Sequence, residues 1–203
     1  GYAEQSGLVD KIDGDINSIE GVEFINQNPI GKSSRSNPVT YVKAYDDIRN
    51  LYASQKLSKS RGYKSANFSF NIDGGRCDVC KGEGEIIVEM QFMADIHLTC
   101  EECDGKRFKE EVLDIKVKEK NISDILHLTI DEAIDFFSQF SGSIEKRIVT
   151  KLMPLQEVGL GYVHLGQSSN TLSGGEAQRV KLASFLTKKE SKDKLLFIFD
   201  EPT

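Results

Sequence analysis

The feature that most restricts the fold of this chain is the spacing of its four cysteines. They form two Cys-x-x-Cys pairs, Cys77 with Cys80 and Cys100 with Cys103, separated by residues 81–99. Each pair can turn two sulfurs toward one point, and two pairs complete the tetrahedron in which zinc is bound. We therefore expect residues 77–103 to form one small module that closes around its own sulfurs.

Metal binding competes with two other uses of these thiols. Disulfides are rare in cytosolic proteins, and the start of the chain lacks the basic-then-apolar pattern of a secretion signal. A redox role is disfavoured because two pairs occur, both followed by glycines that free the backbone for tight turns. Cysteines fill the whole ligand shell, so the sequence predicts about one structural zinc ion per chain and no catalytic metal.

The stretch between the pairs predicts a β-hairpin. EIIVEMQF (85–92) alternates and puts Ile86, Val88, Met90 and Phe92 on one face, as in a half-buried strand. IHLT (96–99) is expected to return beside it as the partner strand. The module is therefore expected to resemble a zinc ribbon.

A second motif lies near the other end of the chain. LSGGEAQR (172–179) has the pattern of the signature sequence of ABC-type ATPases. It places a serine and two glycines at the start of a helix, where free amides and the helix dipole favour a phosphate. A plain capped helix would not need both glycines. The candidate nucleotide-binding residues here are Ser173, Gly174, Gly175 and Glu176.

The signature has a matching partner in LLFIFDEPT (195–203). The continuous apolar run predicts a strand buried on both faces of a sheet. Asp200 at its end can hold a magnesium ion through water, and Glu201 can polarise the attacking water. These two carboxylates are the candidate catalytic residues of an ATPase.

An apparent phosphate-binding loop at NQNPIGKS (26–33) does not fit its pattern. The P-loop requires a glycine five positions before Gly31, and that position is Asn26. Pro29 also removes an amide from the would-be cradle. A signature and an acidic strand without a P-loop make half of each shared nucleotide site. Because the chain also lacks an initial Met and stops at Thr203, we expect a segment of a longer protein.

The remaining pattern predicts a mixed α/β fold. VEFINQ (22–27) reads as a strand that runs into a loop, and Pro38 is suited to start a helix. A strand is expected at VLDIKVK (112–118), and a helix from a capping box at Thr129 to Phe140. Apolar residues from Ile144 to Leu155 mark a further helix, which Pro154 should kink or divide.

One stretch of the chain is locally basic. The net charge of −6 argues against wholesale coating of nucleic acid but says nothing about local patches. Aromatic residues at Tyr63, Phe68 and Phe70 interleave with the basic ones, so this stretch is a candidate DNA surface. Alternatively, the aromatics belong to the core and the lysines are simply solvated. The candidate DNA-binding residues are Lys56, Lys59, Arg61, Lys64 and Arg76.

Four stretches together resemble one known family. They are NQNPIGKSSRSNPVTY, the segment from RGYKSANF to DGKRF with its cysteines, YVHLGQSSNTLSGGEAQRVKLA and LFIFDEPT. These resemble the C-terminal nucleotide-binding half of the UvrA family, the ABC-type component of the bacterial excinuclease, over almost all of residues 26–203. The resemblance identifies residues 26–33 as part of the Q-loop, so that Gln27 would sense magnesium and the γ-phosphate of ATP. The family usually has Asp at the position of Asn26.

The resemblance also implies a domain organisation and an activity. Residues 1–37 would belong to the ATPase core, 38–155 to an inserted helical domain with the zinc module at 77–103, and 156–203 to the signature helix and acidic strand. The P-loop would precede Gly1, and the switch histidine and D-loop would follow Thr203. We expect this segment alone to be inactive, because nothing in it grips the β- and γ-phosphates.

The family's role gives the expected partners. It binds damaged duplex DNA as a homodimer in bacterial nucleotide excision repair, part of the SOS response, and passes the DNA to UvrB through its other half. A cytoplasmic location is expected, since no apolar run reaches the roughly 18 residues of a membrane span. Two other classes are a zinc-dependent protein- or nucleic-acid-binding module without ATPase role, and the ATPase component of a transporter. The first leaves LSGGEAQR and DEPT unexplained, and the zinc insertion argues against the second.

Overall fold

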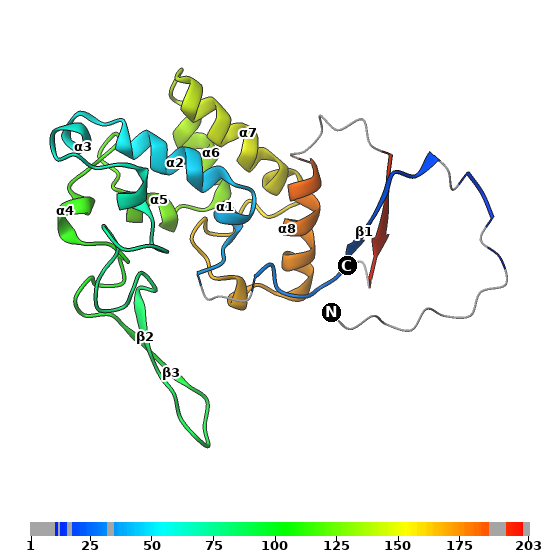
Figure 1. Cartoon of the computed structure of the whole chain (residues 1–203), viewed down its shortest axis with the longest axis horizontal. Helices are drawn as coiled ribbons and strands as arrows, with labels where there is room; N and C mark the ends of the chain where they lie inside the picture. The colour runs from blue at the N-terminus through cyan, green and yellow to red at the C-terminus, as the bar shows by residue number, and fades with distance from the viewer. Residues whose placement is uncertain (1–10, 12, 16–17, 32–34, 187–193, 201–203) are drawn as a thin grey trace.

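The computed structural model describes residues 11, 13–15, 18–31, 35–186 and 194–200, and it has a mixed α/β fold. A body of helices carries one two-stranded sheet at its side and a hairpin that projects away from it (Figure 1). The helices are α1 (Pro38–Tyr41), α2 (Ala44–Ala53), α3 (Lys56–Ser60), α4 (Glu110–Leu113), α5 (Ile122–His127), α6 (Ile130–Ser138), α7 (Ser143–Glu157) and α8 (Gly174–Leu186). The strands are β1 (Gly21–Ile25), β2 (Glu85–Val88), β3 (Ile96–Thr99) and β4 (Leu195–Phe199).

Polar residues cap the starts of two helices in the body. Asn37 caps α1 and Pro38 occupies its first position, as expected. Thr129 and Glu132 form the predicted capping box at the start of α6, with Glu132 N–H donating to Thr129 Oγ1 at 3.2 Å. The helix expected after Ser143 is also present, but it continues through Pro154 to Glu157 without being divided.

The core of the body lies between α2, α6 and α7. Helix α7 buries Ile148, Leu152 and Leu155 completely, and α2 contributes Ile48 and Tyr52 at 0 % exposure. Deleting one such aliphatic side chain typically costs about 2–5 kcal/mol. The packed helices therefore support the two regions at the periphery, the β1–β4 sheet and the β2–β3 hairpin.

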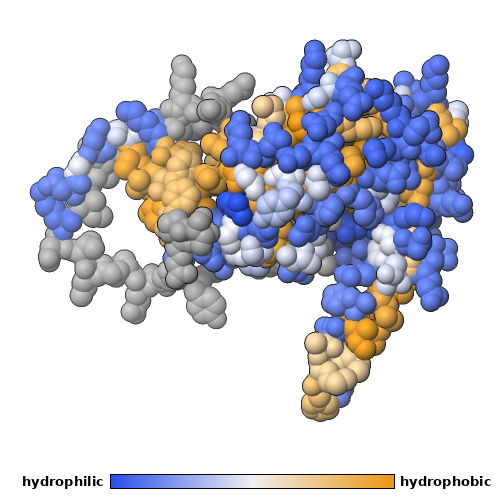
Figure 2. All heavy atoms as spheres, turned by 180° about the vertical axis from the view of Figure 1, so that it is seen from behind, coloured by the Kyte–Doolittle hydropathy of each residue, from blue (hydrophilic) through white to orange (hydrophobic). Residues whose placement is uncertain are grey.

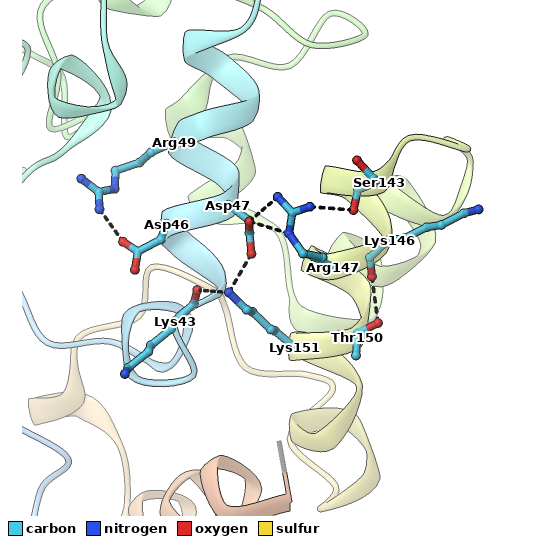
Figure 3. A network of polar contacts seen from close by, with 9 residues as sticks. All are labelled: Lys43, Asp46, Asp47, Arg49, Ser143, Lys146, Arg147, Thr150 and Lys151. Carbon is cyan, nitrogen blue, oxygen red and sulfur yellow. Dashed lines mark hydrogen bonds and ion pairs between the residues drawn. The ribbon is translucent and has the colours of Figure 1, made fainter. Parts of the chain in front are cut away.

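A buried carboxylate fastens α2 to α7 (Figure 3). The Asp47 side chain is 8 % exposed and accepts hydrogen bonds from Arg147 at 2.9 Å and from Lys151 at 2.7 Å. Lys151 also donates to the carbonyl of Lys43 at 3.0 Å. These contacts join segments about a hundred residues apart and fix the angle between the two helices.

The strand expected at residues 112–118 is wrong. Glu110–Leu113 form the short helix α4, and the only pairing nearby within the described residues is an isolated bridge between Val117 and Lys120. Val112, Ile115 and Val117 are all buried against the body. The apolar side chains thus meet the core through a helical turn and a tight bend, which an alternating pattern cannot distinguish from a strand.

Strands β1 and β4 form a parallel pair in register from Gly21–Leu195 to Ile25–Phe199. Helix α8 lies between this pair and the body (Figure 1), and Phe185 of α8 meets Phe197 of β4 at 5.4 Å between ring centroids. In β4 itself, Leu196 and Ile198 are each 43 % exposed. The expectation that LLFIF is buried on both faces is therefore wrong for the described residues.

Strands β2 and β3 form the expected antiparallel hairpin, with Glu85 opposite Thr99 and Val88 opposite Ile96. The hairpin stands clear of the body, and its apolar end is visible in Figure 2. Val88 is 41 % exposed and Phe92 is 95 % exposed, so the expectation of a half-buried strand is wrong. Alternation predicted a strand over 85–92, but the strand ends at Val88, and no element of the described chain covers its apolar side chains.

Helix length and hydropathy also bear on membranes. In the described ranges, none of the helices combines the length and apolar character needed to span a bilayer.

Candidate nucleotide site and metal centre

The four cysteines come together at the base of the hairpin. Their sulfurs all lie within 4.8 Å of one another, and each side chain is buried. The Sγ atoms of Cys77 and Cys100 are 3.9 Å apart, and those of Cys80 and Cys103 are 3.6 Å apart. Four sulfurs at these separations, each from a tight turn, form a donor set that could hold a metal ion and is compatible with zinc.

Backbone contacts position these sulfurs. The N–H of Cys77 donates to the carbonyl of Arg107 at 2.9 Å, and the N–H of Cys100 donates to the carbonyl of Gly84 at 3.0 Å. Gly82 has φ +88°, and a Cβ there would lie 2.1 Å from the carbonyl oxygen of Phe70. A glycine is required at this turn because a side chain would collide with rigid backbone.

Burial and neighbouring sulfurs oppose ionisation of one thiol in the cluster. Burial raises the pKa of the Cys103 thiol to about 12, and the nearby sulfurs of Cys80 and Cys100 act in the same direction. A divalent cation would reverse this preference, since it stabilises thiolates directly.

The signature segment starts helix α8 with a closed set of hydrogen bonds. Glu176 Oε2 accepts from the Ser173 N–H at 2.7 Å, and Ser173 Oγ accepts from the Glu176 N–H at 3.3 Å. Tyr162 donates its hydroxyl proton to Glu176 Oε1 at 2.6 Å. The Tyr162 bond and the Ser173 amide hold the pKa of Glu176 below its usual value. Glu176 therefore fixes the start of α8 as a capping residue.

Gln27 lies against the start of the same helix. A Cβ built on Gly174 would come within 2.5 Å of Gln27 Oε1 and 3.0 Å of Gln27 Cβ. Only glycine at position 174 lets the Gln27 side chain approach this closely. The residue expected to sense nucleotide and the candidate signature glycine are thus direct neighbours.

The carboxyl ends of the two parallel strands meet beside these residues. Asp200 directly follows β4, and its N–H donates to the carbonyl of Ile25, the last residue of β1, at 3.2 Å. Ligands of parallel α/β sheets bind at this edge. The structure thus brings Gln27, Gly174 and Asp200 into one region. Glu201, as well as Lys32 and Ser33 of the GKS tripeptide, lies outside the described residues.

Two residues of α8 that sequence reasoning missed hold this region together. Gln178 donates to the carbonyls of Ile25 and Asp200 at 3.0 and 2.9 Å, and Lys181 donates to Asn26. Gln178 lies inside LSGGEAQR, and Lys181 follows it by one helical turn on the same face. Their spacing could have drawn attention to them, but their partners lie far away in the sequence.

The candidate DNA-binding residues differ in exposure and in the contacts that they already make within the chain. Lys56, Lys59 and Lys64 are exposed. Arg61 pairs with Asp114 at 2.9 Å, and Arg76 pairs with Asp73 at 2.8 Å. Both arginines also donate to backbone carbonyls. The arginines are thus committed to local contacts, whereas the three lysines face solvent.

The aromatic residues of that stretch mostly belong to the core. Phe68 and Phe70 are 0 % exposed, and Tyr63 packs edge-on against Phe68 at 6.3 Å between ring centroids. For Phe68 and Phe70 the structure supports the alternative that these rings are core residues.

A cavity of about 420 Å³ lies between the cysteine module and the loop that leads into the signature. Arg107 lines it from the module, with its guanidinium 5.6 Å from the centre of the Phe70 ring. His127 and His164 line it from the body, and each has Nδ1 2.7 Å from a backbone carbonyl oxygen. The module and the loop that leads into the signature therefore face each other across this cavity.

A parallel strand pair with a signature-type helix at its carboxyl end, and an insertion with a four-cysteine cluster, define a partial ABC-type nucleotide-binding fold. Comparison with known proteins specifies it further: the chain is homologous over its whole length to UvrABC system protein A. The relative from Aquifex aeolicus is 52% identical over 203 residues, which is all of this chain and 21% of that protein. The relative from Clostridium acetobutylicum is 53% identical over 191 residues, 93% of this chain and 20% of that protein.

A solved structure agrees with these relatives. UvrA2 from Deinococcus radiodurans superposes with a TM-score of 0.85 at 44% sequence identity, over 94% of this chain and 23% of that one. No family model matches the chain. The chain spans about a fifth of the length of the curated relatives that it matches.

Proposed function

We propose that this chain is the signature- and zinc-bearing segment of a DNA-damage-recognition ATPase of nucleotide excision repair. The complete protein would bind damaged duplex DNA and couple that binding to binding and hydrolysis of ATP. The observation that carries the proposal is the approach of Gln27, Gly174 and Asp200 at the carboxyl ends of β1 and β4. Relatives named UvrABC system protein A support the repair role.

The nucleotide site would be shared between two nucleotide-binding units. Asp200 would hold magnesium through water, Glu201 would polarise the attacking water, and Gln27 would sense the γ-phosphate. Ser173, Gly174 and Gly175 would direct the free amides of α8 at the phosphates of nucleotide bound to the P-loop of the other unit. Glu176 would keep that helix start in position through Ser173 and Tyr162.

Zinc would have a structural role in this segment. Cys77, Cys80, Cys100 and Cys103 would hold the ion, which would close the module that carries the hairpin. Since the module lines the same cavity as the loop that leads into the signature, its integrity would bear on both the DNA surface and the nucleotide site.

The DNA surface would use phosphate contacts. Lesions differ in chemistry, so contacts to the backbone and the deformability of damaged DNA suit their recognition better than base readout. Lys56, Lys59 and Lys64 are the exposed candidates, whereas Arg61 and Arg76 would have to exchange their present partners. UvrB would bind the other half of the complete protein.

ATP hydrolysis by the complete protein tests the proposal. We expect damaged DNA to stimulate turnover, and Glu201→Gln to abolish it while nucleotide binding persists. Turnover that is insensitive to DNA would favour a transporter-type ATPase. Absence of turnover together with DNA or peptide binding would favour a zinc-dependent binding module without ATPase role.

The second candidate, a binding module, has one observation in its favour. The hairpin exposes apolar side chains, Phe92 and Met93 above all, as a surface for protein or nucleic acid would.

For the isolated segment we expect no hydrolysis of ATP. Turnover by this segment that disappears on Lys32→Ala would contradict both the proposed site and the Q-loop assignment.

A further inference from the structure

We propose that Gln178 and Lys181 are positioning residues that link the signature helix to the Q-loop and the acidic strand of the same copy, so that a change at the nucleotide reaches α8. The proposal rests on the function proposed above. It concerns residues outside the expected set of nucleotide ligands, and it is carried by three independent contacts between α8 and the ends of β1 and β4.

The first contact is made by Gln178. Its side chain is 5 % exposed, and Nε2 donates to the carbonyl of Ile25 at 3.0 Å and to the carbonyl of Asp200 at 2.9 Å. An amide group has two N–H donors, and here each strand end accepts one of them. A change in the separation of the two strand ends would therefore strain or break the hydrogen bonds of Gln178, and so act on α8.

The second contact is made by Lys181, one turn further along α8. Nζ donates to the carbonyl of Asn26 at 3.0 Å and to Asn26 Oδ1 at 2.6 Å. Within the part of the chain that the structure describes, Lys181 forms no ion pair with a carboxylate. Burial lowers its pKa. A half-buried ammonium held by uncharged oxygens is sensitive to any movement of them, because few other partners can replace them.

The third contact is the approach of Gln27 to Gly174. Asn26 and Gln27 are consecutive, so α8 meets the start of the Q-loop twice, at its first residue and two turns later. A shift of Gln27 toward nucleotide must therefore move α8 or break these contacts. Since α8 would serve the site completed by the other nucleotide-binding unit, this link would couple the two nucleotide sites.

The test uses the complete protein and measures a coupling factor. This is the ratio of the dissociation constants for a fluorescein-adducted duplex without and with adenylyl imidodiphosphate. A coupling factor of one means that nucleotide does not affect DNA binding. Lys181→Met, which keeps the length of the side chain, should bring the factor at least about fivefold closer to one. Lys181→Arg should restore it. Asn26→Asp places a carboxylate beside the ammonium and should leave the factor at or above the wild-type value.

Two measurements separate positioning from a merely structural role. The affinity for the nucleotide analogue alone and the thermal unfolding midpoint should stay near wild type in Lys181→Met. Lys146→Met makes the same replacement at an exposed lysine of α7 and should leave the coupling factor unchanged. Gln178 is buried, so Gln178→Met can also destabilise the contact between helix and sheet. The Lys181 variants are therefore the ones that decide the test.

The outcomes are distinguishable. If the wild type shows a coupling factor different from one and Lys181→Met keeps it, this inference is wrong and the proposed function stands. A Lys181→Met protein that loses stability and coupling together, without rescue by arginine, would also overturn it. If the wild type neither binds the duplex nor responds to nucleotide, the proposed function fails and this inference fails with it.

Discussion

The cysteine module and the nucleotide region are built in opposite ways. In the module, all four candidate ligands lie within residues 77–103 and the turns that hold them are local. In the nucleotide region, Ile25, Gln178 and Asp200 come from opposite ends of the chain and meet only through tertiary packing. A local site can be recognised from its spacing, whereas a distributed site depends on the body that aligns its parts.

Removing one ligand should break the module and produce the largest effect. Cys100→Ser leaves three sulfurs, and structural zinc sites contribute on the order of 10 kcal/mol to the folding of their modules. We expect bound zinc to fall from about one ion per chain to a small fraction, and amide exchange to accelerate in residues 77–103 but not in α6 and α7. Elemental analysis and hydrogen exchange measure both.

The control for this change lies next to the module. His97 pairs with Glu85 on the hairpin at 3.1 Å but is not part of the cysteine cluster. His97→Ala should therefore keep its zinc. Full zinc content in Cys100→Ser, or loss in His97→Ala, would contradict the assignment of ligands.

The body that aligns the distributed region should depend on Asp47. Asp47→Ala leaves Arg147 and Lys151 without their shared partner, but both reach solvent, so we expect a loss of about 2 kcal/mol of unfolding free energy. Asp46→Ala is the matched control, because Asp46 pairs with Arg49 at the surface and should cost under about 0.5 kcal/mol. Urea denaturation measures the unfolding free energies. Equal losses in the two variants would show that Asp47 does not fasten α2 to α7.

The same carboxylate gives a pH dependence of stability. Burial opposes ionisation of Asp47, but hydrogen bonds from Lys151 and Arg147 outweigh it, and the pKa in the folded protein is lowered. The contribution is therefore complete above the unfolded pKa of about 3.9 and is lost as the pH falls through the lower folded value. The difference in unfolding midpoint between wild type and Asp47→Asn should be constant from pH 7 to about 5 and shrink toward pH 3. A difference that grows on acidification would reverse the sign of this account.

The hairpin should give the smallest effect on stability. Phe92 is 95 % exposed, so Phe92→Ser should change the unfolding free energy by under about 0.5 kcal/mol. If the chain acts as a binding module, the second candidate function, the same variant should weaken binding of its protein or nucleic-acid partner. A stability loss above about 1 kcal/mol would mean that the tip is covered in solution.

Sequence reasoning reached the local features but missed the contacts of Gln178 and Lys181 that hold the distributed region together. The capping box at Thr129 and the hairpin at 85–99 follow from spacing alone, and the structure confirms both. The strand expected at 112–118 failed because tertiary packing turned the same alternation into a helical turn and a bend. The contacts of Gln178 join residues 153 positions apart, and no local pattern encodes such a pairing.

The central claim is that the Q-loop and the signature form one nucleotide region, and Gly174→Ala in the complete protein tests it most directly. The added Cβ would lie 2.5 Å from Gln27 Oε1 and 3.0 Å from Gln27 Cβ, so the two must separate. Alanine favours the helix, so a loss of activity would not come from unfolding of α8. We expect DNA-stimulated ATP turnover to fall at least about tenfold toward the background set by Glu201→Gln, with the unfolding midpoint unchanged. Turnover equal to that of the wild type would contradict the account.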